Sequence, residues 1–257
     1  ILYAGSICGV DRIFRIGGAQ AIAAMAYGTE SIPKVDKIFG PGNRFVTKAK
    51  QQLSSVVAID MPAGPSEVLI MADHTASPTF VAADMLSQAE HGSDSQAMLV
   101  CSNEKIAYTV RAEIERLSAQ LSRSTSVENS LSHSRLMVFN SIDDMIGFVN
   151  IYAPEHLIIS MENPWKIAES VRAAGSVFIG NYSPESAGDY ASGTNHTLPT
   201  GGWARSFSGV NIDSFIRKIT FQELTRDGLE SLATTIITMA DAEGLDAHAL
   251  AVKVRIQ

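Results

Sequence analysis

Short apolar segments alternate with helical segments along most of this chain, and this alternation limits the fold more than any other feature. Apolar runs of strand length lie at residues 12–16, 37–39, 56–60, 67–71, near 100, and at 136–139, 157–160 and 176–180. Segments with helical periodicity follow most of these runs. Because parallel strands are joined by crossover helices, we predict an α/β fold with parallel sheets.

The segment Met-Pro-Ala-Gly-Pro-Ser at 61–66 is rich in turn residues and separates two series of strands and helices. We therefore predict a domain boundary there and divide the chain into residues 1–65, 66–200 and 201–257. The last part is expected to be mainly helical, with Thr225 as an N-cap. Residues 122–132 are predicted to form a polar connection. Residues 181–208, rich in Gly, Ser, Thr, Asn and Pro, are predicted to form a long functional loop.

Composition excludes several classes of protein. The net charge is -7 and Lys and Arg are not clustered, which argues against nucleic acid or an anionic membrane surface as a partner. No apolar run reaches the roughly 20 residues of a membrane span, and no signal peptide is evident, so we expect a cytoplasmic protein. The chain opens on Ile1, inside a helical segment, and we expect a preceding segment that this sequence does not represent.

Four side chains from three segments could hold a metal ion: Gln88, His91, Asp189 and His248. Their donor groups are amide, imidazole and carboxylate, a set that suits zinc with positions open to a substrate, whereas closed structural zinc sites usually recruit thiolates. Gln88 and His91 are three residues apart on one predicted helix and share a face. Each segment alone is also typical of a solvated helix end or an ordinary turn, so the prediction depends on their combination.

Glu155 and His156 follow a helix-stopping proline and precede an apolar strand. Two adjacent side chains of a strand cannot both point into one core, so at least one is expected to be exposed or functional. An isolated Glu-His pair is also common on protein surfaces. Two glycine turns, at 17–18 and 40–43, each lead into a helix and are compatible with a bound phosphate, but neither has the G-x-G-x-x-G pattern. These segments alone leave the cofactor open.

Taken together, these segments resemble the histidinol dehydrogenase family, most closely its enterobacterial type. The resemblance is carried by G-G-A-Q-A-I-A-A at 17–24, K-V-D-K-I-F-G-P-G-N at 34–43, I-D-M-P-A-G-P-S-E-V at 59–68, L-S-Q-A-E-H at 86–91, A-P-E-H-L at 153–157 and S-P-E-S-A-G-D-Y-A-S-G-T-N-H at 183–196. It implies two incomplete Rossmann-like parallel-sheet domains and a helical C-terminal arm. The family's N-terminal stretch has no counterpart here, and residues 51–56 are shorter than the family's corresponding loop.

The resemblance also implies site residues. It implies one Zn²⁺ per subunit, held by Gln88, His91 and Asp189 of one subunit and by His248 of the partner subunit in a homodimer with a shared active site. Substrate-binding positions would be Ser66, Gln88, His91, His156, Asp189, Glu243 and His248. Gln20 and Asn43 match positions that contact NAD, and Glu155 and His156 match the catalytic pair.

The reaction implied is the oxidation of L-histidinol to L-histidine through a bound aldehyde, with two NAD and one water. His156 is suited to take the alcohol proton, and Glu155 to activate the water that hydrates the aldehyde. Zinc would act chiefly as an orienting template. Two alternatives are a metal-binding dimeric fragment without turnover and a zinc hydrolase that needs no NAD, so NAD dependence would separate the three.

Overall fold

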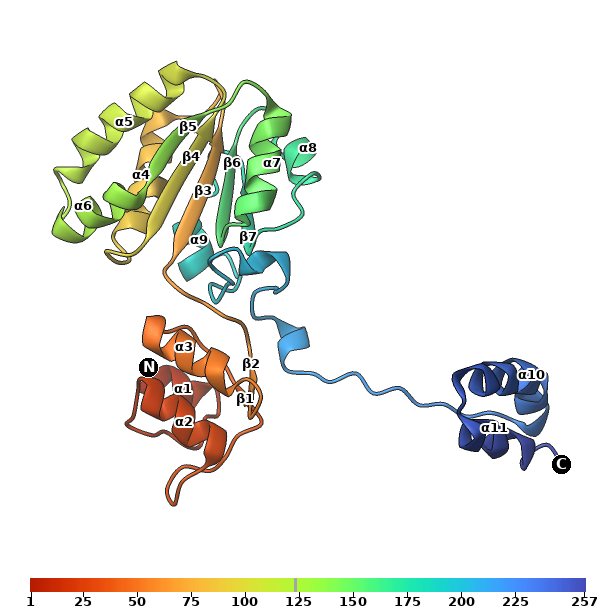
Figure 1. The fold of residues 1–257 in the computed structure, drawn as a ribbon. Coiled ribbons are helices and arrows are strands. Elements are labelled where there is room, and N and C mark those ends of the chain that lie inside the picture. Colours follow the sequence, from red (N-terminus) through yellow and green to blue (C-terminus); the bar gives the residue numbers. More distant parts are fainter. Residues whose placement is uncertain (123) are drawn as a thin grey trace. The chain divides into compact units, whose positions relative to one another are not determined.

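A five-stranded parallel sheet organises the larger part of the structure (Figure 1), a computed structural model that describes residues 1–122 and 124–257. Its strands are β3 (Glu67–Ala72), β4 (Gln96–Cys101), β5 (Arg135–Val138), β6 (His156–Ser160) and β7 (Ser176–Ile179), in the order β5-β4-β3-β6-β7. The helices α4 (Pro78–Ala89), α5 (Glu104–Ser118) and α6 (Ser124–His133) lie on one side; α7 (Ile142–Tyr152) and α8 (Pro164–Ala168) lie on the other. The predicted α/β class is confirmed.

The central strand β3 has an uninterrupted apolar run because both of its faces are covered. Val68 and Ile70 pack into the core cluster that includes residues of α4 and α5, whereas Leu69 and Met71 pack into the cluster that includes residues of α7. All six residues of β3 are buried. Parallel sheets with helices on both faces typically show such continuous apolar strands.

The strand order reverses between β3 and β6, as it does between the two halves of a dinucleotide-binding sheet. Ligands usually bind at the carboxyl ends of strands beside such a point. Here the carboxylate of Asp73, which follows β3 at that end, accepts hydrogen bonds from the backbone of Thr75 (2.9 Å) and Glu162 (2.7 Å). Glu67 and His156, the first residues of β3 and β6, lie at the opposite end.

A smaller parallel sheet lies in the N-terminal part of the chain. It pairs β1 (Lys37–Ile38) with β2 (Ala58–Ile59), and its core includes residues of α2 (Ala19–Tyr27) and α3 (Arg44–Leu53). The chain begins with α1 (Leu2–Ile7). The predicted strand at residues 12–16 is wrong: Ile13, Phe14 and Ile16 are exposed, and the segment has no paired strand among the described residues. Apolar composition without a partner strand does not produce a strand.

Three other sequence predictions need correction. Residues 124–133 form α6 rather than a loop, because Val127 and Leu131, one helical turn apart, pack toward the core despite the polar composition around them; residue 123 lies outside the described residues. The helix predicted at 164–174 ends at Ala168, where the side chain of Asn150 bonds the backbone of Ser170 and Arg172 instead. The predicted loop 181–208 contains α9 (Glu185–Tyr190) and the short 3-10 turn η1 (Trp203–Arg205); a second turn, η2 (Ile212–Ser214), follows it.

Contacts divide the chain into two compact units, Ile1–Phe215 and Ile216–Gln257. The second unit holds α10 (Arg226–Glu243) and α11 (Asp246–Lys253), joined at Gly244 in the left-handed region (φ 71°), so the predicted helical tail is confirmed. The Thr225 side chain accepts a hydrogen bond from the Gly228 N–H and caps α10 as predicted. The limits 1–65, 66–200 and 201–257 stay a prediction. No helix in the described part of the chain is long and apolar enough to cross a membrane.

Candidate active site

Glu155 and His156 enter the structure at the start of β6, where both are held by the backbone of the neighbouring strand β3. The Glu67 N–H donates to Glu155 Oε2 at 2.9 Å, and the Glu67 carbonyl lies 3.3 Å from His156 Nδ1. The two side chains are 5% and 3% exposed, so the alternative of an ordinary surface pair does not hold. Gly175 lies directly behind Glu155, where a Cβ would come within 2.6 Å of the Glu155 carbonyl oxygen.

Helices α4 and α9 bring a second group of polar side chains to the same end of the sheet. Gln88 is fully buried on α4, and His91 lies just past the end of that helix rather than in its last turn as predicted. From α9, Glu185 Oε1 lies 3.7 Å from His91 Nε2 and 3.8 Å from His156 Nδ1. Donor atoms of His91, Glu185 and Asp189 all lie within 4.8 Å of one another.

A cavity of about 200 Å³ joins the two groups. The residues that line it are Pro41, Ala63, Gly64, Ser66, His91, Glu155, His156, Asp189, His196, Leu198 and Thr200. A neighbouring cavity of about 750 Å³ shares Ser66 and His91 with it and extends to Asn43. The structure thus brings together five predicted residues: Ser66, His91, Glu155, His156 and Asp189. They meet because the amino ends of the parallel strands β3 and β6, the carboxyl end of α4 and the helix α9 lie at one edge of the sheet.

Burial sets the ionisation of this site. It raises the pKa of Glu155 well above its usual range and the pKa of Glu185 to about 8, and neighbouring carboxylates, Asp189 among them, add to both shifts. Burial also lowers the pKa of His156 to about 4, so its imidazole is neutral at physiological pH. His156 Nε2 is buried without a hydrogen-bond partner. A neutral imidazole with one free nitrogen can accept a proton from a substrate.

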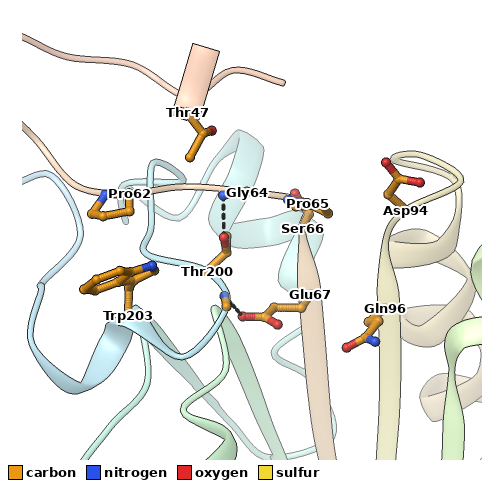
Figure 2. A pocket seen from close by; sticks show the side chains of 11 residues that line it. Thr47, Pro62, Gly64, Pro65, Ser66, Glu67, Asp94, Gln96, Thr200 and Trp203 are labelled. Carbon is orange, nitrogen blue, oxygen red and sulfur yellow. Dashed lines mark hydrogen bonds between the residues drawn. The ribbon is translucent and has the colours of Figure 1, made fainter. Parts of the chain in front are cut away.

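Glu67 lines a second cavity, of about 300 Å³, whose lining does not include Glu155 or His156. Figure 2 shows its carboxylate accepting the Gly201 N–H (2.6 Å), while Thr200 Oγ1 accepts the Gly64 N–H (2.5 Å). These bonds fix part of the predicted functional loop against β3. The same residue therefore contacts Glu155 and His156 through its backbone and the loop through its side chain.

The remaining predicted residues are not among those that line this cavity. Gln20 is exposed on α2, and the Asn43 side chain caps α3 by accepting the N–H groups of Phe45 (3.0 Å) and Val46 (3.2 Å). Glu243 and His248 are exposed residues of the C-terminal unit. Their roles in NAD and substrate binding stay predictions. Sequence analysis missed Glu185, although its spacing of four residues from Asp189 places both on one face of a helix.

The model of the histidinol dehydrogenase family matches residues 1–256. This chain belongs to that family. It is 58% identical over 258 residues to histidinol dehydrogenase of Bacteroides fragilis (strain YCH46), covering 100% of this chain and 60% of that protein. It is 55% identical over 260 residues to the Aliivibrio fischeri enzyme, covering 100% and 59%.

The fold agrees with a solved member of the histidinol dehydrogenase family. The crystal structure of histidinol dehydrogenase from Elizabethkingia anophelis matches with a TM-score of 0.96 and 55% identity, over 100% of this chain and 59% of that one. The chain thus spans about 60% of the length of the relatives it matches.

Replacing Gly188 by alanine is expected to disturb the α9 side of the site. A Cβ there would lie 2.7 Å from the ring of Phe178 and 3.0 Å from Thr194 Oγ1, so the helix that carries Glu185 and Asp189 must shift. We expect a loss of about 1–3 kcal/mol in the free energy of unfolding and weaker zinc binding, measured by urea unfolding and chelator competition. Gly147→Ala on α7 is the matched control, because its Cβ would meet nothing within 4 Å. Equal behaviour of the two variants would contradict this packing argument.

The metal-free chain is expected to lose stability as the pH rises from about 6.5 to about 8. In this window Glu185, with its pKa raised to about 8, holds a proton in the folded state that it has lost in the unfolded state. The pKa of Glu155 is raised as well, so Glu155 contributes in the same direction. The neutral His156 opposes this trend only below pH 6.5, where its unfolded form gains a proton. Urea midpoints with a chelator present should therefore fall across the window, and fall less in Glu185→Gln. A rising midpoint would contradict the assignment.

Proposed function

We propose that this chain carries the metal-binding and acid–base half of a histidinol dehydrogenase active site, which oxidises L-histidinol to L-histidine through L-histidinaldehyde. One observation carries the proposal: a single cavity gathers His91, Asp189, Glu155 and His156 in a member of this family. The relatives named histidinol dehydrogenase are longer than this chain, so the complete activity is proposed rather than assigned.

The donor set fits zinc. Gln88, His91 and Asp189 would hold the ion, with His248 of the partner subunit as the fourth ligand in a homodimer. Imidazole, amide and carboxylate are acceptable zinc ligands, and such a set leaves room for a substrate. The residues that line the cavity include carboxylates but no Lys or Arg, so a divalent cation would offset their charge. Zinc, when bound, would supply a template that orients the nitrogen atoms of the substrate.

NAD, when bound, would accept a hydride in each of two oxidations, and we propose contacts from Gln20 and Asn43. The side-chain oxygen of Asn43 already caps α3, so its amide nitrogen is the group left to donate to a ligand. Asn43 also lines the cavity of about 750 Å³ that shares Ser66 and His91 with the candidate active site. This continuity supports a cofactor that approaches the substrate from the side of α3.

The chain's own residues supply the proton transfers. His156 Nε2 is neutral and unpaired, so it can accept the hydroxyl proton of L-histidinol as the carbon is oxidised. Glu155 lies next to it, with its carboxyl group held by the Glu67 N–H. Burial favours the protonated form of this carboxyl in the metal-free chain, and the positive charge of a bound divalent cation would favour the carboxylate that takes a proton from the water that adds to the aldehyde. Burial limits the access of bulk water to both groups, which helps to retain the aldehyde between the two steps. Two further residues are proposed to bind substrate: Ser66 and Glu243 of the partner subunit.

The test is formation of NADH by the purified chain with L-histidinol, NAD and added zinc. Turnover would support the full proposal. Zinc binding without turnover would favour a metal-binding fragment that depends on residues outside this chain. Cleavage of ester or amide substrates without NAD would identify a zinc hydrolase and refute the proposed reaction. Sedimentation measured in parallel would test the homodimer.

A further inference from the structure

Glu185 is the most enclosed ionisable residue of the site, yet neither the proposed metal ligands nor the acid–base pair includes it. It is the first residue of α9 and only 1% exposed. Its carboxylate faces Gln88 and lies 3.7 Å from His91 Nε2 and 3.8 Å from His156 Nδ1. The two imidazole nitrogens are too distant for direct hydrogen bonds, so the closest polar partner in the described structure is the Gln88 amide.

The chemistry of this contact fixes the orientation of the Gln88 amide. If its oxygen faced the ionised form of Glu185, which a bound cation would favour, acceptors would face acceptors in a buried site. With the nitrogen toward Glu185, Nε2 lies 3.1 Å from both carboxylate oxygens and can donate to them. We therefore assign the amide in this orientation. The carbonyl oxygen of Gln88 then lies on the far side of the amide from Glu185.

We propose that Glu185 is a positioning residue: it holds the side-chain nitrogen of Gln88, so that the side-chain carbonyl oxygen of Gln88 is free to bind the metal ion. This inference rests on the proposed zinc site. A neutral amide binds a metal through its oxygen, because its nitrogen offers no available lone pair. A partner that binds the nitrogen therefore selects the correct donor atom, as second-shell carboxylates do for histidine ligands. The Gln88 side chain is completely buried, so water cannot replace that partner.

The competing role is that of a direct ligand, since Glu185 lies within 4.8 Å of the donor atoms of His91 and Asp189. The two roles differ in what a change of Glu185 does. A positioning residue can be replaced by any side chain that accepts the Gln88 N–H, and the metal keeps its ligands. A ligand cannot be changed without altering the coordination of the metal.

The first experiment observes Gln88 directly in the metal-free chain labelled with ¹⁵N-glutamine. The Gln88 amide protons are expected to exchange slowly in the wild type and in Glu185→Gln, whose side-chain carbonyl still accepts, and to lose protection in Glu185→Leu. Gln96 is the internal control, because its side-chain oxygen accepts from the Tyr152 hydroxyl, a contact that does not involve Glu185. Unchanged Gln88 protection in both variants would overturn the inference. This readout needs no bound zinc, so it decides the contact even if the proposed metal site fails.

The second experiment measures metal binding by chelator competition and the absorption spectrum of the Co²⁺-loaded chain. Glu185→Leu is expected to bind zinc roughly 10–100-fold more weakly, the usual loss for a second-shell partner. Glu185→Gln should lose less and keep the wild-type Co²⁺ bands, and Glu169→Gln, at an exposed position, should match the wild type. An altered Co²⁺ spectrum in Glu185→Gln would make Glu185 a ligand and overturn the inference. Absence of metal binding in the wild type would refute the proposed zinc site instead.

Discussion

His156→Asn is expected to lower the rate of L-histidinol oxidation by about 10²–10⁴-fold, the usual contribution of a general acid–base residue. Asparagine keeps a polar group near the Glu67 carbonyl, which lies 3.3 Å from Nδ1, but offers no basic nitrogen in place of the unpaired Nε2. The substrate proton then has no acceptor at that position. NADH formation measures the effect. The assay uses this chain if the chain turns over substrate, and otherwise a longer histidinol dehydrogenase that carries the same substitution at the corresponding position.

The control for this variant is His133→Asn, at an exposed position at the end of α6, which should leave the rate unchanged. Zinc content and the urea midpoint of His156→Asn should also stay near the wild-type values, because the proposed metal ligands are other side chains. Loss of zinc together with activity would count against the assignment of His156 as acid–base residue and in favour of a role in the metal site.

Lys50→Met is expected to destabilise the unit Ile1–Phe215 by about 3–5 kcal/mol, because it leaves a buried carboxylate without its charge partner. Lys50 is 2% exposed, and its ammonium group pairs with Asp60 and donates to the Gly40 carbonyl at 2.9 Å. Asp60 also accepts the N–H groups of Gly40 and Met61, each at 2.7 Å. The ion pair thus fixes the turn that leads to Asn43, and its loss should also weaken NAD binding.

Urea unfolding followed by circular dichroism measures the stability of this variant. Lys48→Met, at an exposed position on the same helix, is the matched control and should change the free energy of unfolding by no more than about 0.5 kcal/mol. The double variant Lys50→Met, Asp60→Asn should recover part of the loss, because it removes the uncompensated charge and keeps a side-chain oxygen that can accept an N–H group. A Lys50→Met midpoint equal to that of the control would show that the pair contributes nothing.

The location of the site has a consequence for how this sheet is used. In a dinucleotide-binding sheet the crevice beside the reversal of strand order lies at the carboxyl ends of the strands. In this chain the Asp73 side chain at that end accepts hydrogen bonds from the backbone N–H groups of Thr75 and Glu162, and the candidate site lies at the amino ends. The larger sheet therefore positions the proposed metal ligands of this cavity and the proposed acid–base residues, and the proposed NAD contacts lie in the part that carries the smaller sheet.

Local sequence was sufficient wherever the signal was short-range. The apolar run at 67–71 predicted β3, Asn43 and Thr225 each begin a helix, and the alternation of strands and helices predicted the parallel sheet. The apolar run at 12–16 misled because strand formation depends on a partner that composition does not reveal. Helix α6 was missed for the related reason that few of its inward-facing side chains are apolar: Val127 and Leu131 pack in the core, and Ser130 is buried with its hydroxyl donating a hydrogen bond to the Ser95 carbonyl.

The sequence by itself determined the α/β class, the family, and the residue types that could bind a metal or transfer protons. Only the tertiary structure decided that Ser66, His91, Glu155, His156 and Asp189 line one cavity, since they lie on segments far apart in the chain. It alone revealed Glu185, whose importance comes from the Gln88 amide that it faces. The physical reason is that burial and the neighbours across the sheet set donor orientation and pKa, and neither is encoded in the spacing of residues along the chain.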